Sequence, residues 1–153
     1  MKRAALWAIN IGIAASVTSG QAYAGGKQKG CSLATLDGQY MFGGQGTLFP
    51  PAFGVKTPSI ANSAGFHIFN GDGTGTDFVT FSVNGIDQHV PSPVAITYTL
   101  NSDCTGTYSV QNGPNFDIFV AVDGSELSTI NTDPSVAASQ GPQPRVGSRQ
   151  NAQ

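Results

Sequence analysis

The feature that most limits what this chain can fold into is its succession of short β-prone runs divided by turn residues. Gly, Asn, Asp and Pro recur every few residues, and no window sustains the helical spacing of apolar residues. In residues 94–100 and 116–122, apolar side chains alternate with smaller or polar ones. This alternation is typical of strands that bury one face. The chain is therefore predicted to be all-β.

Turn signals divide the chain into eight expected strands. Asn84-Gly85 and Asp123-Gly124 are strong signals for two-residue hairpins. Residues 43–44 (GG) and 91–93 (PSP) indicate a bend, a bulge or an edge position inside a strand. The expected strands are residues 39–49, 64–69, 74–83, 86–100, 107–111, 115–122, 125–131 and 145–150, with loops at 50–63 and 132–144.

Eight short strands joined mainly by hairpins predict an antiparallel up-and-down meander. Its apolar face must be buried, either in a closed barrel or in a β-sandwich. We favour the barrel, because pairing the last strand with the first removes two open sheet edges that would otherwise invite aggregation. The expected divisions are a signal peptide (1–24), a flexible lead with Cys31 (25–38), a barrel domain (39–150) and a tail (151–153).

The first residues have the pattern of a secretory signal. Lys2 and Arg3 precede a mostly apolar run over residues 4–17, and Ala22 and Ala24 place small residues where a signal peptidase reads them. The alternative is a membrane anchor, but the run is shorter than the ~20 residues that a spanning helix needs. We predict cleavage after Ala24 and a secreted or periplasmic bacterial protein, with no stable membrane insertion once the signal is removed.

The charge content argues against a nucleic-acid partner. Only 10% of residues are charged, compared with about 25% in typical soluble domains. Nucleic-acid binding needs clustered Lys and Arg, and the few basic residues lie mainly near the two ends of the chain.

The two cysteines, Cys31 and Cys104, are expected to form a disulfide, since an even pair in an exported protein is usually bonded. A redox pair or a metal site is the alternative. Redox cysteines usually lie close together as C-x-x-C, and zinc would want more Cys or His nearby.

The stretch at residues 69–85, FNGDGTGTDFVTFSVNG, could be a phosphate-binding loop, a calcium loop or a turn. A phosphate loop needs a following helix, whereas β-alternating residues follow here. An EF-hand needs several acidic residues and a closing Glu, but only Asp72 and Asp77 are present. We therefore interpret residues 70–73 as a hairpin turn.

The candidate ligand site is the lumen of the barrel. Aromatic side chains on the strands would either fill the interior or line a cavity for one small apolar ligand. The candidates for this lining are Tyr40, Phe42, Phe66, Phe78, Tyr98, Tyr108 and Phe116.

No catalytic, metal or cofactor motif is found, so an enzyme is not favoured. His67, on the face opposite Phe66, and His89 lie on different strands without a nearby Glu or Cys, which makes a poor metal site. Asp117 is expected to face solvent; the alternative is a buried acid partnered by His67 or a tyrosine, and a buried unpaired carboxylate is costly.

Several segments together resemble a group of small exported bacterial proteins related to the allene oxide cyclase-like and lipocalin-like eight-stranded barrels. They are CSLATLDGQYMFGGQGTL from Cys31, FNGDGTG from Phe69, SVNG from Ser82, DCTGTYSV from Asp103, FDIFVAVDG from Phe116 and INTDPS from Ile130. The resemblance implies a barrel closed by residues 145–150 and a Cys31–Cys104 pair. Members are mostly of unknown function, and no motif here matches the catalytic residues of the plant cyclases.

Three functional hypotheses follow. The first is an exported barrel that binds a small apolar molecule or has a structural role. The second is a cyclase or isomerase acting on a small hydrophobic substrate, and it depends on the resemblance alone. The third is an eight-stranded outer-membrane barrel, against which the chain lacks a terminal aromatic residue and paired aromatic girdles.

Overall fold

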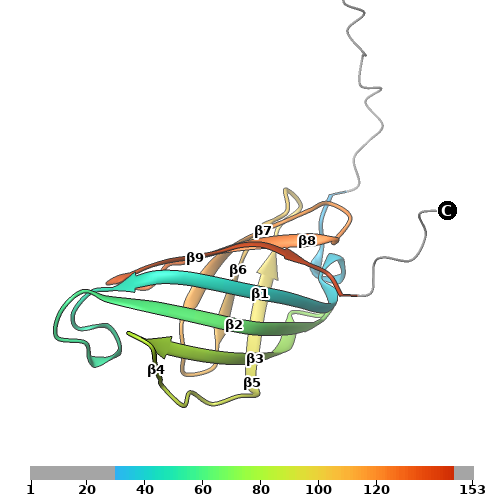
Figure 1. Cartoon of the computed structure of the whole chain (residues 1–153). Helices are drawn as coiled ribbons and strands as arrows, with labels where there is room; N and C mark the ends of the chain where they lie inside the picture. The colour runs from blue at the N-terminus through green and yellow to red at the C-terminus, as the bar shows by residue number, and fades with distance from the viewer. Residues whose placement is uncertain (1–29, 147–153) are drawn as a thin grey trace, which may run out of the picture.

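A computed structural model describes residues 30–146, and in this range the strands form one antiparallel sheet that closes on itself (Figure 1). The predicted signal peptide and the 151–153 tail lie outside the described residues. The strands are β1 Asp37–Leu48, β2 Ser59–Asn70, β3 Thr74–Val83, β4 Ile86–Asp87, β5 Val94–Leu100, β6 Thr105–Val110, β7 Asn115–Val120, β8 Glu126–Asn131 and β9 Val136–Pro144.

The predicted barrel is confirmed. Pairing runs β2-β1-β9-β8-β7-β6-β5-β3, and β2 also pairs with β3 to close the ring of eight strands. The short β4 pairs only with β3 and extends its hairpin. The Asn84-Gly85 turn between them has positive φ at both residues, 49° and 81°, as a tight hairpin with twisted strands requires.

Two predicted boundaries, both in proline-containing stretches, differ from the structure. The loop expected over residues 50–63 ends earlier, since β2 begins at Ser59 and pairs along its whole length with β1. The strand expected over residues 86–100 is interrupted between β4 and β5. The interruption contains Pro91 and Pro93, which cannot donate ladder hydrogen bonds.

The closing strand is also not the predicted one. Residues 132–144 were expected to form a loop, but residues 136–144 form β9, which pairs with both β1 and β8. The β8–β9 register shifts between Leu127 and Thr129, opposite Gly141 and Pro142. A bulge of this kind tolerates proline. In residues 145–150, which were expected to close the barrel, Arg145 makes one isolated bridge with Tyr40, and 147–150 lie outside the described residues.

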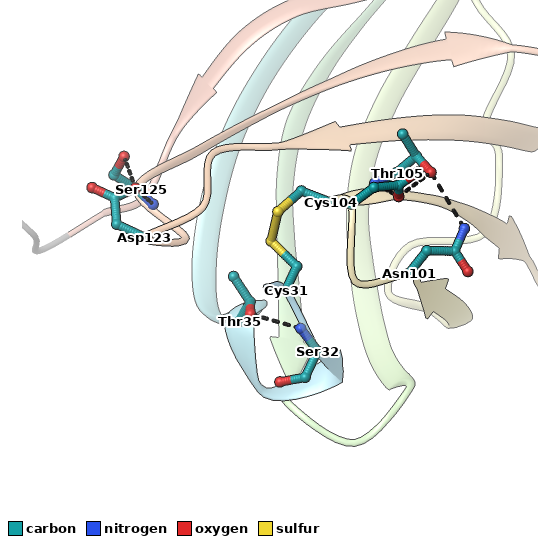
Figure 2. Close-up of a disulfide and its surroundings, with 9 residues drawn as sticks. Cys31, Ser32, Thr35, Asn101, Cys104, Thr105, Asp123 and Ser125 are labelled. Carbon is teal, nitrogen blue, oxygen red and sulfur yellow. Dashed lines mark hydrogen bonds between the residues drawn. A yellow bond between two sulfur atoms is a disulfide. The ribbon is translucent and has the colours of Figure 1, made fainter. Parts of the chain in front are cut away.

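One end of the barrel is plugged by the segment before β1. Cys31 is bonded to Cys104 of the β5–β6 turn, with 5.0 Å between the Cα atoms, so the predicted disulfide is confirmed (Figure 2). A 3-10 turn, η1 (Leu33–Thr35), follows and leads to the fully buried Leu36. The described part of the expected flexible lead is therefore ordered, because its apolar side chains complete the core at this end.

The core of this closed end is aromatic and aliphatic. It contains Leu36, Tyr40, Phe69, Ile96, Tyr98, Tyr108, Phe116, Ile118, Val120 and Leu127, with Leu33 and Cys104 packed against it. A second, smaller cluster of Leu48, Ala61 and Val83 lies toward the opposite end, where η2 (Ala52–Gly54) packs on it through Ala52.

Three turns at the closed end repeat one hydrogen-bonding pattern. In each, an aspartate accepts hydrogen bonds from the backbone N–H and the hydroxyl of the residue two positions later: Asp72 from Thr74, Asp103 from Thr105 and Asp123 from Ser125. The last of these turns lies near η1 in Figure 2. Such Asx turns fix the chain reversal without a helix. The glycine stretch at 69–85 is accordingly a turn and a strand.

Within residues 30–146, no helix has the length and apolar character needed to cross a membrane.

Candidate functional site

The interior holds a cavity of about 410 Å³ that opens at the end opposite the disulfide. Its size lies within the ~300–1,000 Å³ typical of small-molecule pockets. The wall is mainly apolar, and its polar contributors include Asp77, Ser63 and Gln140. The apolar side chains of the wall come from strands all around the barrel and include Phe42, Leu48, Val79, Phe81, Val94, Tyr108, Val110, Phe116 and Val136.

Five of the seven predicted lumen residues are buried inside the barrel. Phe42, Tyr108 and Phe116 border the cavity, and the rings of Tyr108 and Phe116 are stacked with centroids 4.5 Å apart. Tyr40 and Tyr98 belong to the same closed-end core as Tyr108 and Phe116 but are not part of the cavity wall. They therefore serve packing there and do not border the cavity.

The hydroxyls of Tyr40 and Tyr98 bind backbone carbonyls of the β7–β8 turn and of the segment before β1, which plugs this end. The Tyr40 hydroxyl donates to the Gly124 carbonyl at 2.6 Å, and the Tyr98 hydroxyl lies 2.9 Å from the carbonyl of Leu33 and 3.0 Å from that of Leu36. Burial raises the pKa of Tyr40 to about 12, with a smaller opposing effect of the Arg145 charge. Both phenols are therefore neutral hydrogen-bond donors under ordinary conditions.

Phe66 and Phe78 do not border the cavity. They are paired across β2 and β3 and stack with centroids 4.5 Å apart. Each alternates with a buried polar residue, His67 or Asp77, and successive side chains of a strand point to opposite faces. The aromatic pair therefore lies on the outer face, next to the exposed Met41 of β1.

The residues that take the inner positions are His67 and Asp77, which face each other across the β2–β3 ladder. His67 Nδ1 lies 3.1 Å from Asp77 Oδ1, and the two side chains are 0% and 5% exposed. Asp77 forms part of the cavity wall, whereas His67 lies behind it, outside the wall. The pair therefore presents a carboxyl group, rather than an imidazole, to the cavity.

Aromatic rings hold the imidazole of His67 in place. The ring of Phe42 is stacked on it, with centroids 4.4 Å apart and an interplanar angle of 11°. Tyr108 meets it edge-on at 5.2 Å. Gly65, which pairs with Phe42, provides the space, because a Cβ there would lie 3.1 Å from the Phe42 ring and would clash with the Phe78 carbonyl. The rotation of the imidazole is therefore restricted.

The proton of the imidazole is best placed on Nδ1. His67 Nε2 is fully buried and has no hydrogen-bond partner among the described residues. An imidazolium would leave a charged N–H unpaired at this position, which is costly. The neutral tautomer with Nδ1–H donates to Asp77 and leaves only a lone pair at Nε2. In this tautomer the negative charge of the Asp77 carboxylate is not cancelled.

Two polar groups bordering the cavity keep free hydrogen-bonding capacity. Within residues 30–146, neither Asp77 Oδ2 nor the Tyr108 hydroxyl makes a hydrogen bond to another protein group. Burial raises the pKa of Tyr108 well above its ordinary value, and the charge of Asp77 raises it further. Tyr108 therefore stays protonated and can donate a hydrogen bond to a molecule in the cavity.

A second polar group of side chains lies on β8 and β9. Gln140 Oε1 accepts hydrogen bonds from Thr129 Oγ1 at 3.2 Å and from Gln143 Nε2 at 3.1 Å. These three residues are buried, and the interactions among them satisfy most of their polar atoms. Among these three side chains, Gln143 Oε1 is the buried atom that has no hydrogen-bond partner in the described chain. This cluster holds the bulged strand in register and is mostly occupied by its own contacts.

Sequence reasoning missed Asp77, although the signal was present. A hairpin turn centred on Asp72 places residues at equal distances from it opposite each other, and His67 and Asp77 are each five residues away. The other polar candidates are exposed. Asp117 faces solvent, as predicted. The side chain of His89 is 87% exposed and lies 3.3 Å from Asp87.

No group of three or more metal-ligating side chains occurs among residues 30–146. The comparisons with known proteins add no assignment: the chain matches no protein-family model, no curated protein and no solved structure. The resemblance to allene oxide cyclase-like and lipocalin-like proteins stays a prediction.

Proposed function

We propose that this protein is an exported barrel that binds a small, largely apolar molecule in its interior cavity. The observation that carries the proposal is the cavity of about 410 Å³, whose mainly apolar wall includes Phe, Tyr, Leu and Val side chains and which is open at one end. Burial of apolar surface supplies roughly 25 cal/mol per Å², so a molecule that fills this space gains most of its affinity from contact with the wall.

Export is supported by the disulfide and by the sequence of the first residues. The Cys31–Cys104 bond closes a loop of 73 residues, and such bonds persist mainly in oxidising compartments. Together with the signal pattern before Gly25, this favours a secreted or periplasmic location. The mass of the exported protein tests the cleavage after Ala24.

The experiment for ligand binding fills the cavity with a side chain. Val79 lines it, whereas the neighbouring Thr80 is exposed on the outer face. We expect Val79→Phe to weaken the binding of a neutral, environment-sensitive fluorescent dye at least about tenfold, because the added ring takes up space that the dye would use.

The matched control is Thr80→Phe, which adds the same ring outside the barrel and should leave the dye affinity unchanged. Circular dichroism would verify that both variants fold. The proposal fails if the wild-type protein binds neither the dye nor any alkyl probe, or if Val79→Phe and Thr80→Phe affect binding equally.

A further inference from the structure

The cavity wall contains a buried polar position where a head group could be recognised. Asp77 and Tyr108 come from β3 and β6, which have only β5 between them in the ring, and both border the cavity. The two groups are close enough for the charge of Asp77 to raise the pKa of the Tyr108 phenol, in addition to the larger effect of burial. The Asp77 carboxylate accepts hydrogen bonds, and the Tyr108 hydroxyl can donate or accept one.

His67 makes this position rigid before any ligand arrives. It binds Oδ1 of Asp77 from outside the cavity and is itself held between Phe42 and Tyr108. The carboxylate therefore has one oxygen engaged by the protein and the other, Oδ2, available on the cavity side. A buried polar group with free capacity favours a ligand that satisfies it over one that does not.

We propose that the cavity selects amphiphiles whose head group donates a hydrogen bond, a hydroxyl or an amino group, and rejects carboxylates. This inference depends on the proposed function, since it specifies the ligand class of the same cavity. The head group donates to Asp77 Oδ2 and exchanges a hydrogen bond with the Tyr108 hydroxyl, while the alkyl part contacts the apolar wall. A carboxylate would place a second negative charge beside Asp77, and like charges repel strongly where water is scarce.

The test compares three probes with the same alkyl chain: decanol, decylamine and decanoate, each below its micelle-forming concentration. Isothermal titration calorimetry at neutral pH with the mature protein gives their affinities. We expect decanol or decylamine to bind at least about tenfold more tightly than decanoate, which is the size of one hydrogen bond to a charged group. Tighter binding of decylamine would identify the amino group as the preferred donor, and tighter binding of decanol the hydroxyl.

Asp77→Asn tests the role of the carboxylate. The amide oxygen can still accept from His67 Nδ1, while its NH₂ group now faces the cavity as a donor. The preference against decanoate should therefore disappear. Tyr108→Phe should weaken the binding of decanol, because one hydrogen-bonding partner of its hydroxyl is lost. The discrimination against decanoate should remain, because the charge of Asp77 is unchanged.

The matched control is Asp117→Asn, which removes the same charge from the outer face of β7 and should keep the wild-type order of affinities. The inference is overturned if wild-type protein binds decanoate as tightly as the other two probes, a result that needs no variant to fold. It is also overturned if folded Asp77→Asn keeps the preference. If the neutral dye binds while decanoate equals decanol, only this inference fails, whereas absence of all binding removes the proposed function itself.

Discussion

At the scale of single residues, the barrel interior contains a polar pair that apolar packing alone does not require. His67 and Asp77 are almost fully buried, and each is the other's hydrogen-bond partner. Breaking such a pair by removing one member leaves a buried polar group uncompensated, which typically costs about 3–5 kcal/mol, whereas replacing both members by apolar residues is often nearly neutral.

The stability of one single variant, compared with that of the double variant, measures this dependence. We expect His67→Leu to lower the free energy of unfolding by roughly 3 kcal/mol, because it leaves the Asp77 carboxylate without its donor. The double variant His67→Leu/Asp77→Leu should recover most of that loss. Urea denaturation followed by circular dichroism gives the values. Equal destabilisation by the single and the double change would show that the two residues do not act as a pair.

The inner face of β2 and β3 shows why residue-level prediction succeeds only in part. Phe42, Tyr108 and Phe116 are predicted as lumen residues and border the cavity. Phe116 lies in the alternating run of residues 116–122, where the apolar face is easily assigned. On β2 and β3 both faces carry aromatic or polar residues, so hydrophobicity selects the wrong face for Phe66 and Phe78. The hairpin register would have placed His67 opposite Asp77 without any hydrophobic argument.

At the scale of elements, turn residues allow better predictions than strand residues. The turns at Asn84-Gly85, Asp123-Gly124 and residues 70–73 follow from local chemistry, which is independent of the rest of the fold. β9 could not be predicted in this way. Its sequence, VAASQGPQP, has polar Gln140 and Gln143 at buried positions. Its strand structure comes from pairing with β1 and β8.

The three aspartate turns predict how stability depends on pH. Hydrogen bonds from the Thr or Ser hydroxyl, then from the backbone, lower the pKa of Asp72, Asp103 and Asp123 below the ordinary value of 3.8. A lowered folded-state pKa contributes stability above the unfolded-state value. The contribution is lost as pH falls through the lowered values, so the melting temperature should decrease in acid below about pH 4.

The triple variant Thr74→Val/Thr105→Val/Ser125→Ala removes the hydroxyl donors and keeps the backbone ones. We expect the three carboxyl pKa values to move up toward 3.8, as followed by carbon-detected NMR titration. Thr80→Val, which changes a strand residue outside these turns, serves as the control. Unchanged carboxyl pKa values in the triple variant would contradict the assigned role of the hydroxyls.

At the scale of the whole molecule, the barrel has two unlike ends. One end is filled by the Leu33–Leu36 segment, the aromatic core and the disulfide, and the other gives access to the cavity. The disulfide links the start of the described chain to the β5–β6 turn, so it fixes the plug and restricts the unfolded chain at the same time.

Removing the disulfide therefore tests the closed end. In the chain-entropy description, a bond across 73 residues stabilises the folded state by roughly 4 kcal/mol. The double variant Cys31→Ser/Cys104→Ser should lower the free energy of unfolding by about that amount in urea denaturation. Added reductant should destabilise the wild-type protein but not the variant. A variant with the wild-type urea midpoint would show that the plug is held by packing alone.

The position of the described chain ends has a practical consequence. Cys31 N–H donates to Ser102 at the closed end, and Val146 N–H donates to Gln39 near the start of β1. Both ends of the described chain thus leave the barrel on the side away from the cavity opening (Figure 1). A reporter or a surface anchor that continues from either end of the described chain is attached on the side away from the opening. Immobilisation through either end therefore leaves the cavity opening clear of the attachment point.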